Sequence, residues 1–345
     1  MKVLVTGAAG LLGSHVAELA LERGHEVRIL IRPGENVSWL ERAGVEVYRG
    51  DLKAFPSLQA AVNGVERVFH CAARMGPWGP ESDYELVNVT GPRLLAEAAL
   101  AAGVQRIVHV SSIDVHGLVV GDGIDETAPY GTERDPYCRS KIAGERALIQ
   151  LIQQKAAPIT IVRPGLIYGP RDTNSFARFA RLIAHGHLPI IGSGANLLPL
   201  IYVRDVALGI LLASLPDCAV GNAYLLVNDE PVTQAAYFHA LASALGVPPP
   251  RLHIPYSLAL ALAAGVEVAA HLAQRQQPPP LMRFGLRQIG GQNHFLIDRA
   301  RTDLGFSPQV TLAEGVRLSV AWYRSLANTT TPPLTDLTIQ KELAQ

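Results

Sequence analysis

Short, β-branched apolar runs alternate with longer stretches of helical periodicity along the first half of the chain. The runs predict buried strands, and the stretches between them predict helices. Strands separated by helices need crossover connections, which produce a parallel sheet covered on both faces. The pattern therefore predicts a doubly wound α/β fold whose ligands bind beyond the carboxyl ends of the strands. Predicted strands span 2–6, 26–31, 45–48, 67–70, 106–110 and 159–163; one predicted helix ends at Glu22, and two others span 84–102 and 136–154.

The regular alternation stops after Pro164, where glycine and proline interrupt residues 165–194. Further on, the pattern predicts strands at 198–203 and 223–227 and a mostly apolar helix at 256–273, between two runs of proline. We therefore expect a main domain over residues 1–165 and a smaller, mostly C-terminal lobe over 166–327, with some segments returning to the main sheet. Residues 328–345 are rich in threonine and proline and are expected to form a flexible tail.

The composition narrows the class of protein. Hydrophobic residues make up 48% of the 345 residues and charged residues 17%, which excludes a disordered chain. Thirty basic and thirty acidic side chains balance, so a nucleic-acid partner is not expected. The three separated cysteines indicate free thiols in a reducing compartment, and no secretory signal precedes the first strand, so we expect a cytoplasmic protein. No uncharged stretch is long enough to span a membrane, and no residues stand at metal-ligand spacing.

A glycine-rich turn lies between the first predicted strand and the first predicted helix. Gly7 permits the tight turn, Gly10 lets the backbone approach a pyrophosphate, and Gly13 lets the helix pack against the strand. The helix would then offer the backbone N–H groups of Leu11 and Leu12 to the phosphates. The motif and its position predict a dinucleotide-binding site.

The residues after the second and third strands bear on the choice of cofactor. An acidic residue after the second strand would accept hydrogen bonds from the ribose and favour NAD. This chain has Arg32 there, which could pair with a 2′-phosphate, so NADP(H) is favoured and NAD(H) stays possible. Asp51 follows the third strand, where it could bind the adenine amine.

Tyr137 and Lys141 stand four residues apart near the start of a predicted helix and so share a face. The ammonium of Lys141 is expected to lower the pKa of the phenol and to hold the nicotinamide ribose. Ser111 and Ser112 follow the fifth strand, where Ser112 could donate a hydrogen bond to the reacting oxygen. Tyr137 would then exchange the proton as general acid or base.

Together these residues resemble the extended short-chain dehydrogenase/reductase superfamily, which includes the NAD-dependent epimerases and dehydratases. The resemblance extends from Lys2 to about Tyr323 and rests on segments 6–13, 50–52, 70–73, 88–91, 111–112, 137–141 and 163–170. It implies a Rossmann-like fold with a substrate-binding C-terminal lobe.

The resemblance also implies roles for individual residues. It identifies Ser112, Tyr137 and Lys141 as the catalytic set. It places Leu52, Ala72, Ala73, Asn88, Ser111, Pro164 and Leu166 at the cofactor, and Tyr168, Trp78, Ser112 and Tyr137 at the substrate. It further implies a homodimer formed through the long helices.

Three branches of the superfamily compete. The sugar dehydratases carry an acid where this chain has Ile113, which disfavours that branch. The epimerases share the catalytic residues and stay possible. The loop around Trp78, the apolar helix at 256–273 and the segment 293–308 resemble the 3β-hydroxysteroid dehydrogenases and 2-alkyl-3-oxoalkanoate reductases.

The substrate lobe is consistent with an apolar substrate. The helix at 256–273 carries a single charged residue, Glu267. A sugar nucleotide would need charged or amide groups at its diphosphate, for which Arg171, Arg178 and Arg181 are the candidates. The same helix could instead pack on the main domain, on a partner subunit or shallowly on a membrane.

The sequence supports three hypotheses about the function. The leading hypothesis is an NAD(P)(H)-dependent oxidoreductase that interconverts a secondary alcohol and a ketone on a hydrophobic 3-hydroxysteroid or 2-alkyl-3-oxoalkanoate. The alternatives are an NDP-sugar epimerase and a non-catalytic NAD(P)-sensing protein, against which the intact Ser112, Tyr137 and Lys141 argue.

Overall fold

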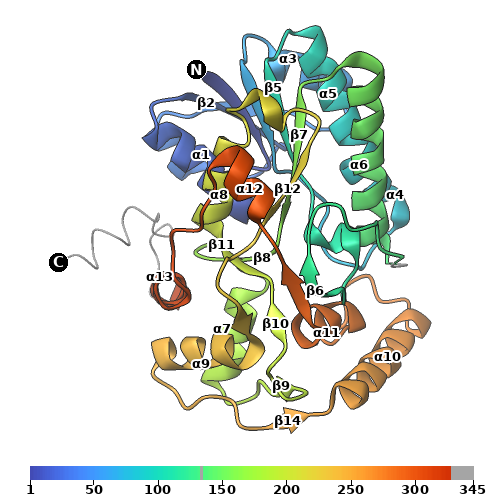
Figure 1. The fold of residues 1–345 in the computed structure, drawn as a ribbon, viewed down its shortest axis with the longest axis vertical. Coiled ribbons are helices and arrows are strands. Elements are labelled where there is room, and N and C mark those ends of the chain that lie inside the picture. Colours follow the sequence, from blue (N-terminus) through green and yellow to red (C-terminus); the bar gives the residue numbers. More distant parts are fainter. Residues whose placement is uncertain (133–134, 328–345) are drawn as a thin grey trace, which may run out of the picture.

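A computed structural model describes residues 1–132 and 135–327. Its main sheet has seven parallel strands in the order β12-β7-β5-β4-β1-β2-β3, with the first strand near the middle (Figure 1). This is a doubly wound, Rossmann-like sheet, which confirms the predicted fold class. The strands are β1 (Lys2–Thr6), β2 (Glu26–Ile31), β3 (Glu46–Arg49), β4 (Arg67–His70), β5 (Arg106–Val110), β7 (Ile159–Pro164) and β12 (Ala223–Leu226).

Helices cover both faces of this sheet because each strand sends alternate side chains to opposite sides. In β1, Leu4 packs in a cluster with α3, α5 and α6, whereas Val3 and Val5 pack in a cluster with α1 and α8. The helices of this domain are α1 (Leu11–Glu22), α2 (Ser38–Arg42), α3 (Phe55–Val62), α4 (Glu81–Tyr84), α5 (Gly91–Ala101), α6 (Pro136–Lys155), α8 (Val203–Leu212) and α12 (Asp298–Leu304).

The helix predicted over 84–102 is not a single α-helix. A π-helical segment, η1 (Glu85–Thr90), separates α4 from α5. The residue responsible is Pro92, which has no N–H to donate to the carbonyl of Asn88 and whose ring clashes with that carbonyl. The turn widens there, and the backbone of α6 approaches it at Gly144, where a Cβ would lie 2.2 Å from the Asn88 carbonyl oxygen.

The remaining elements form the smaller lobe below the sheet in Figure 1. Its helices are α7 (Phe176–Ala184), α9 (Gln234–Leu245), α10 (Tyr256–Leu272), α11 (Arg283–Gly290) and α13 (Leu312–Ala327). Short strands pair between them: β6 (Gly121–Ile124) with β15 (Asn293–Phe295), β8 (Leu166–Tyr168) with β11 (Leu200–Tyr202), β9 (Ile190–Ile191) with β14 (His253–Ile254), and β10 (Leu197–Leu198) with β13 (Val232–Thr233).

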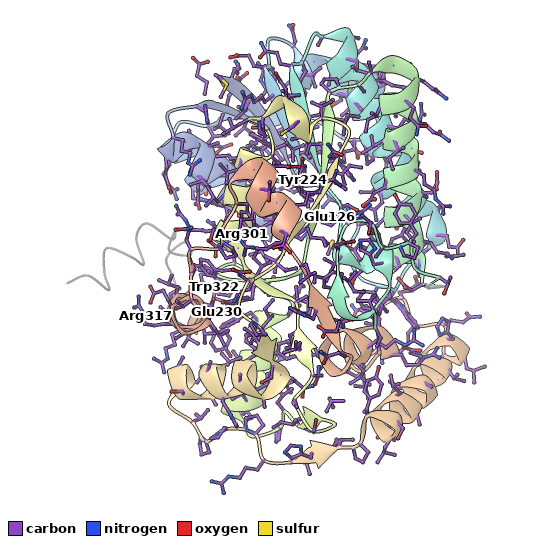
Figure 2. The ribbon with its side chains drawn as sticks, viewed as in Figure 1. Glu126, Tyr224, Glu230, Arg301, Arg317 and Trp322 are labelled. Carbon is purple, nitrogen blue, oxygen red and sulfur yellow. The ribbon has the colours of Figure 1, made fainter. Side chains whose placement is uncertain are left out.

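The chain crosses between domain and lobe more than once. Strand β12 lies beyond residue 165 and yet forms one edge of the main sheet. Two side chains labelled in Figure 2 fix this edge: the carboxylate of Glu126 accepts the N–H of Leu225 at 2.8 Å, and the Tyr224 hydroxyl donates to Asp303 of α12 at 3.0 Å. The predicted tail, 328–345, lies outside the described residues. Among the described residues, no helix has the length and apolar character needed to cross a membrane.

Candidate active site

The glycine turn sits at the carboxyl end of β1, where it leads into α1. Gly7 has a φ of +71°, and a Cβ there would lie 2.7 Å from the backbone nitrogen of Ala72, so only glycine fits. A Cβ at Gly13 would lie 2.4 Å from the Gly7 carbonyl oxygen, so helix and turn are in direct contact.

The start of α1 fits a pyrophosphate. No side chain caps the helix at Gly10, and its first turn contains no acidic residue. A Cβ at Gly10 would meet only the Gly7 carbonyl oxygen, at 3.3 Å, which leaves the outer side of the turn open. Backbone N–H groups and the positive end of the helix dipole are therefore available to an anion at Leu11 and Leu12.

Two arginines stand at the carboxyl ends of β2 and β3. The guanidinium of Arg32 is 72% exposed and bonds to Glu35 at 2.7 Å. Arg49, which sequence reasoning missed, is paired in register with Ile31 and donates to the Glu35 carbonyl at 3.2 Å. Asp51 accepts the N–H of Lys53 at 2.9 Å.

Ser112 and Lys141 meet at the carboxyl end of β5. The ammonium of Lys141 donates to the carbonyl of Val110, the last residue of that strand, at 2.8 Å. Ser112 caps a 3₁₀ turn, η2 (Ile113–His116), by accepting the N–H of Asp114 at 3.1 Å. Burial lowers the pKa of Lys141 to about 8, opposed mainly by Glu145.

Tyr137 completes this group from the first turn of α6. The side chain of Asp135 caps that helix by accepting the N–H of Cys138 at 2.9 Å. Tyr137 is only 3% exposed, and the ring of Phe284 from α11 meets its ring edge-on, with centroids 6.1 Å apart. The structure thus brings the three predicted catalytic residues together.

The pKa of Tyr137 differs from the expectation. Burial raises it well above its ordinary value, the negative charge of Asp114 raises it further, and the neighbouring Ser112 hydroxyl opposes both. Lys141, expected to lower the pKa of the phenol, directs its ammonium to the Val110 carbonyl instead.

Asn88 connects η1 to the loop that follows β4. Its side-chain amide oxygen accepts the N–H of Arg74 at 2.7 Å, and its nitrogen donates to Ser140 of α6 at 2.9 Å. On the other side of the same loop, Thr6 accepts the N–H of Ala72 at 3.3 Å. The segment 72–74, which includes Ala73, is therefore held between the glycine turn and the tyrosine helix.

Two predicted substrate residues lie apart from the catalytic group. The indole of Trp78 packs on His271 of α10, 4.4 Å between centroids, and donates to the carbonyl of Arg275 at 3.2 Å. Tyr168 packs within the lobe against the rings of Tyr202 and Tyr237. Trp78 thus attaches the loop to the lobe, whereas Tyr168 belongs to the core of the lobe.

A cavity of about 10 Å³ adjoins the catalytic group, with room for roughly one water molecule. Among its lining residues, Asp114 carries the single charge, and Gln288 of α11 donates to that carboxylate at 3.1 Å. The lining residues are Ile113, Asp114, Gly117, Leu118, Leu166, Pro199, Gln288, Asn293 and Phe295.

Sequence reasoning also missed a buried ion pair behind Lys141. Glu145, one helical turn further along α6, is fully buried and pairs with Arg163 of β7 at 2.7 Å. The Tyr130 hydroxyl donates to the same carboxylate at 2.9 Å, and Arg163 donates to His116 at 3.1 Å. Arg163 belongs to the segment 163–170 that carries the family resemblance, so that segment was the available signal.

Two further residues predicted at the cofactor lie at strand ends. Pro164 is the last residue of β7, and Ser111 is buried directly after β5.

The site can now be compared with known proteins. A model of the NAD dependent epimerase/dehydratase family matches residues 3–223, more than half of the chain. The chain belongs to this family. A nicotinamide cofactor agrees with that membership and with the glycine turn described above.

Relatives of this chain match more than nine tenths of its length. It is 34% identical to the 2-alkyl-3-oxoalkanoate reductase of Stenotrophomonas maltophilia, covering 92% of this chain and 98% of that one. It is 31% identical to the mouse sterol-4-alpha-carboxylate 3-dehydrogenase (decarboxylating), covering 94% and 91%. The crystal structure of gox2253 superposes with a TM-score of 0.80 at 32% identity, covering 95% and 99%. The prediction of a nicotinamide-dependent oxidoreductase is thereby confirmed at the level of enzyme class.

Proposed function

We propose that this family member interconverts a secondary alcohol and a ketone on a hydrophobic molecule of the 3-hydroxysteroid or 2-alkyl-3-oxoalkanoate type. The observation that carries the proposal is the meeting of Ser112, Tyr137 and Lys141 at the end of β5, with the apolar ring of Phe284 against Tyr137. The names of the two relatives support the substrate class.

The proposed mechanism assigns one task to each residue. Ser112 donates a hydrogen bond to the substrate oxygen and stabilises the charge that develops on it. Tyr137 gives its proton to that oxygen during reduction and takes it back during oxidation. Lys141, whose ammonium lies at the end of β5, would provide a donor for the cofactor ribose. The cofactor supplies or accepts the hydride.

Two of the three candidate arginines of the lobe, Arg171 and Arg178, support this substrate class over a sugar nucleotide. Arg171 forms two bonds with Glu18, at 2.7 and 2.6 Å, and Arg178 donates to the Pro280 carbonyl. These two cations are therefore bonded elsewhere, and neither lines the cavity. A sugar nucleotide would need such cations at its diphosphate.

We propose NADP(H) as the cofactor. Arg32 follows β2, where a 2′-phosphate is expected, and Arg49 bonds to the same residue, Glu35; two cations at these strand ends support this preference. Glu35 works against the preference for NADP(H), because its carboxylate already accepts a hydrogen bond from the Arg32 guanidinium. The homodimer and the cytoplasmic location stay predictions.

The test compares wild type with Tyr137→Phe. NADPH and NADH consumption are followed with 3-ketosteroids, 2-alkyl-3-oxo acids and UDP-sugars. We expect turnover of an apolar ketone by wild type and a loss of roughly 10²–10⁴-fold in the variant, with NADPH affinity unchanged. Epimerisation of a UDP-sugar without net cofactor consumption would contradict the proposal, as would full activity of Tyr137→Phe.

A further inference from the structure

Helix α10 turns an apolar face away from the protein. It lies at the outer edge of the lobe, at the lower right of Figure 1. Four large aliphatic side chains of this helix are exposed: Leu258 by 50%, Leu262 by 52%, Val268 by 58% and Leu272 by 81%. The positions between them on the same face, Ala261, Gly265 and Ala269, are exposed as well and also apolar.

The inner side of α10 carries small buried residues and the charged residue of the helix. Ala259, Ala263 and Ala270, which are small, are its buried residues. Its one charged residue, Glu267, bonds to the backbone N–H of Arg283 at 2.7 Å and to its guanidinium at 2.6 Å, within the lobe. Tyr256 and Leu260 are partly buried against α11. A surface helix of a globular protein normally exposes its charges and not a row of large apolar side chains, so packing within this chain does not explain the outer face of α10.

The charge around the helix is one-sided. Residues 231–297 contain four arginines and one acidic residue, Glu267, although acids and bases balance over the whole chain. Arg251 and Arg275 are exposed and stand just beyond the two ends of α10. The apolar face is therefore flanked by positive charge at both ends. This combination fits the boundary between anionic headgroups and acyl chains.

We propose that α10 docks on an anionic lipid surface. It lies in the plane of that surface, with Leu258, Leu262 and Leu272 in the acyl boundary and Arg251 and Arg275 at the phosphates. With 17 residues the helix is about 25 Å long, and it is too short to span a bilayer.

Docking would place the site of catalysis next to the lipid. The Trp78 loop reaches α10 at His271, and Met75 of that loop is 62% exposed. Helix α11 contacts α10 and carries Phe284, which covers Tyr137. A hydrophobic substrate could thus enter from the lipid beneath α11. This consequence rests on the proposed function, whereas the docking itself does not.

A second copy of the chain is the competing occupant, and the charges disfavour it. In a two-fold dimer through this face, the same patch meets itself. Either alignment of two α10 helices brings the arginine at one end near an arginine of the partner. Like charges repel in such an interface, whereas anionic headgroups attract them.

The experiment measures cosedimentation of the full chain with vesicles, without cofactor or substrate, so that its result is independent of the reaction. One set of vesicles is phosphatidylcholine alone and the other contains phosphatidylglycerol. We expect binding to the anionic set that weakens as salt rises. Leu262→Glu should reduce the partition coefficient roughly tenfold or more. Leu215→Glu is the matched control, because Leu215 is also 52% exposed and lies away from α10.

Urea unfolding checks that both variants are folded. The proposal fails if wild type does not bind anionic vesicles at low salt, or if Leu215→Glu loses as much binding as Leu262→Glu. It also fails if Leu262→Glu converts a dimer into a monomer while wild type ignores the vesicles, because the face would then be a subunit interface.

Discussion

Burial raises the pKa of the Tyr137 phenol. Tyr137 can therefore act as a base only if another group lowers this pKa. Among the neighbouring charges, the carboxylate of Asp114 works most strongly against this, because it raises the pKa of the phenol. Lys141 is close enough to Asp114 to feel its charge, since Asp114 also raises the pKa of the ammonium. Asp114 therefore favours the protonated phenol, whereas the charge of Lys141 is supported mainly by Glu145.

The first prediction concerns Asp114→Asn. Removing the negative charge lowers the pKa of Tyr137, so the ionised phenol forms at lower pH. In alcohol oxidation, where that form is the base, the rise of kcat/KM with pH should move to lower pH. In ketone reduction kcat/KM falls as the phenol loses its proton, and this fall should also move to lower pH. Gln288→Ala is the control, because it removes the contact with Asp114 and keeps the charge. Equal shifts in both variants would contradict this account.

The second prediction concerns cofactor choice. Glu35 holds the exposed guanidinium of Arg32 in a surface ion pair. In Glu35→Gln the arginine is free to bind a 2′-phosphate, so the Kd for NADPH should fall roughly two- to fivefold while that for NADH stays unchanged. Arg32→Ala should have the opposite effect on NADPH. Fluorescence titration measures both, and an equal change for the two cofactors would count against a role in selectivity.

Whether a site residue could be predicted from the sequence depends on how far away in the sequence its partner stands. Tyr137 and Lys141 were predictable because one helical turn separates them, and Ser112 because it ends a buried strand. The contact between Asp114 and Gln288 joins residues 174 positions apart, which no local pattern encodes. The same applies to the bond between Arg49 and the Glu35 carbonyl, which depends on the register of β3 against β2.

At the scale of elements, the parallel strands were the most predictable parts. Buried on both faces, they appear in sequence as continuous apolar runs, and the predicted bounds 26–31, 67–70 and 106–110 coincide with β2, β4 and β5. The π-helical segment was not predicted, because the apolar periodicity continues through it. Its cause is a single Pro92 together with the close approach of α6.

The third prediction tests that approach. Gly144→Ala would put a methyl group 2.2 Å from the Asn88 carbonyl, so α6 and η1 must separate. We expect a loss of about 1–3 kcal/mol of unfolding free energy and reduced turnover, because Asn88 and Tyr137 move apart. In Gly265→Ala, on α10, the Cβ meets nothing within 4 Å, and stability should rise by up to about 1 kcal/mol. Urea unfolding measures the free energy of unfolding of both variants. If the two values change by similar amounts, η1 can shift to accommodate the added methyl group and the prediction is wrong.

At the scale of the whole molecule, residues 163–172 join the sheet to the lobe. A Cβ at Gly165 would lie 2.1 Å from the Pro199 carbonyl, so two connections between domain and lobe touch there. At the end of this segment, Asp172 caps the start of α7 by accepting the N–H groups of Ser175 and Phe176 at 2.9 and 3.0 Å. Between these points Arg171 reaches back to α1.

The last prediction concerns that link. Arg171 and Glu18 form a bidentate pair with side chains only 11% and 10% exposed. Arg171→Ala leaves the Glu18 carboxylate buried without its partner, which should cost roughly 3–5 kcal/mol in urea unfolding. Alanine keeps the strain of the φ of +72° at this position, so the loss reports the ion pair and not the backbone. Glu18→Ala combined with Arg171→Ala should lose less than the sum of the two single variants, since no charge is then stranded. Strict additivity would mean that the two side chains act independently and that this pair does not hold the lobe to the sheet.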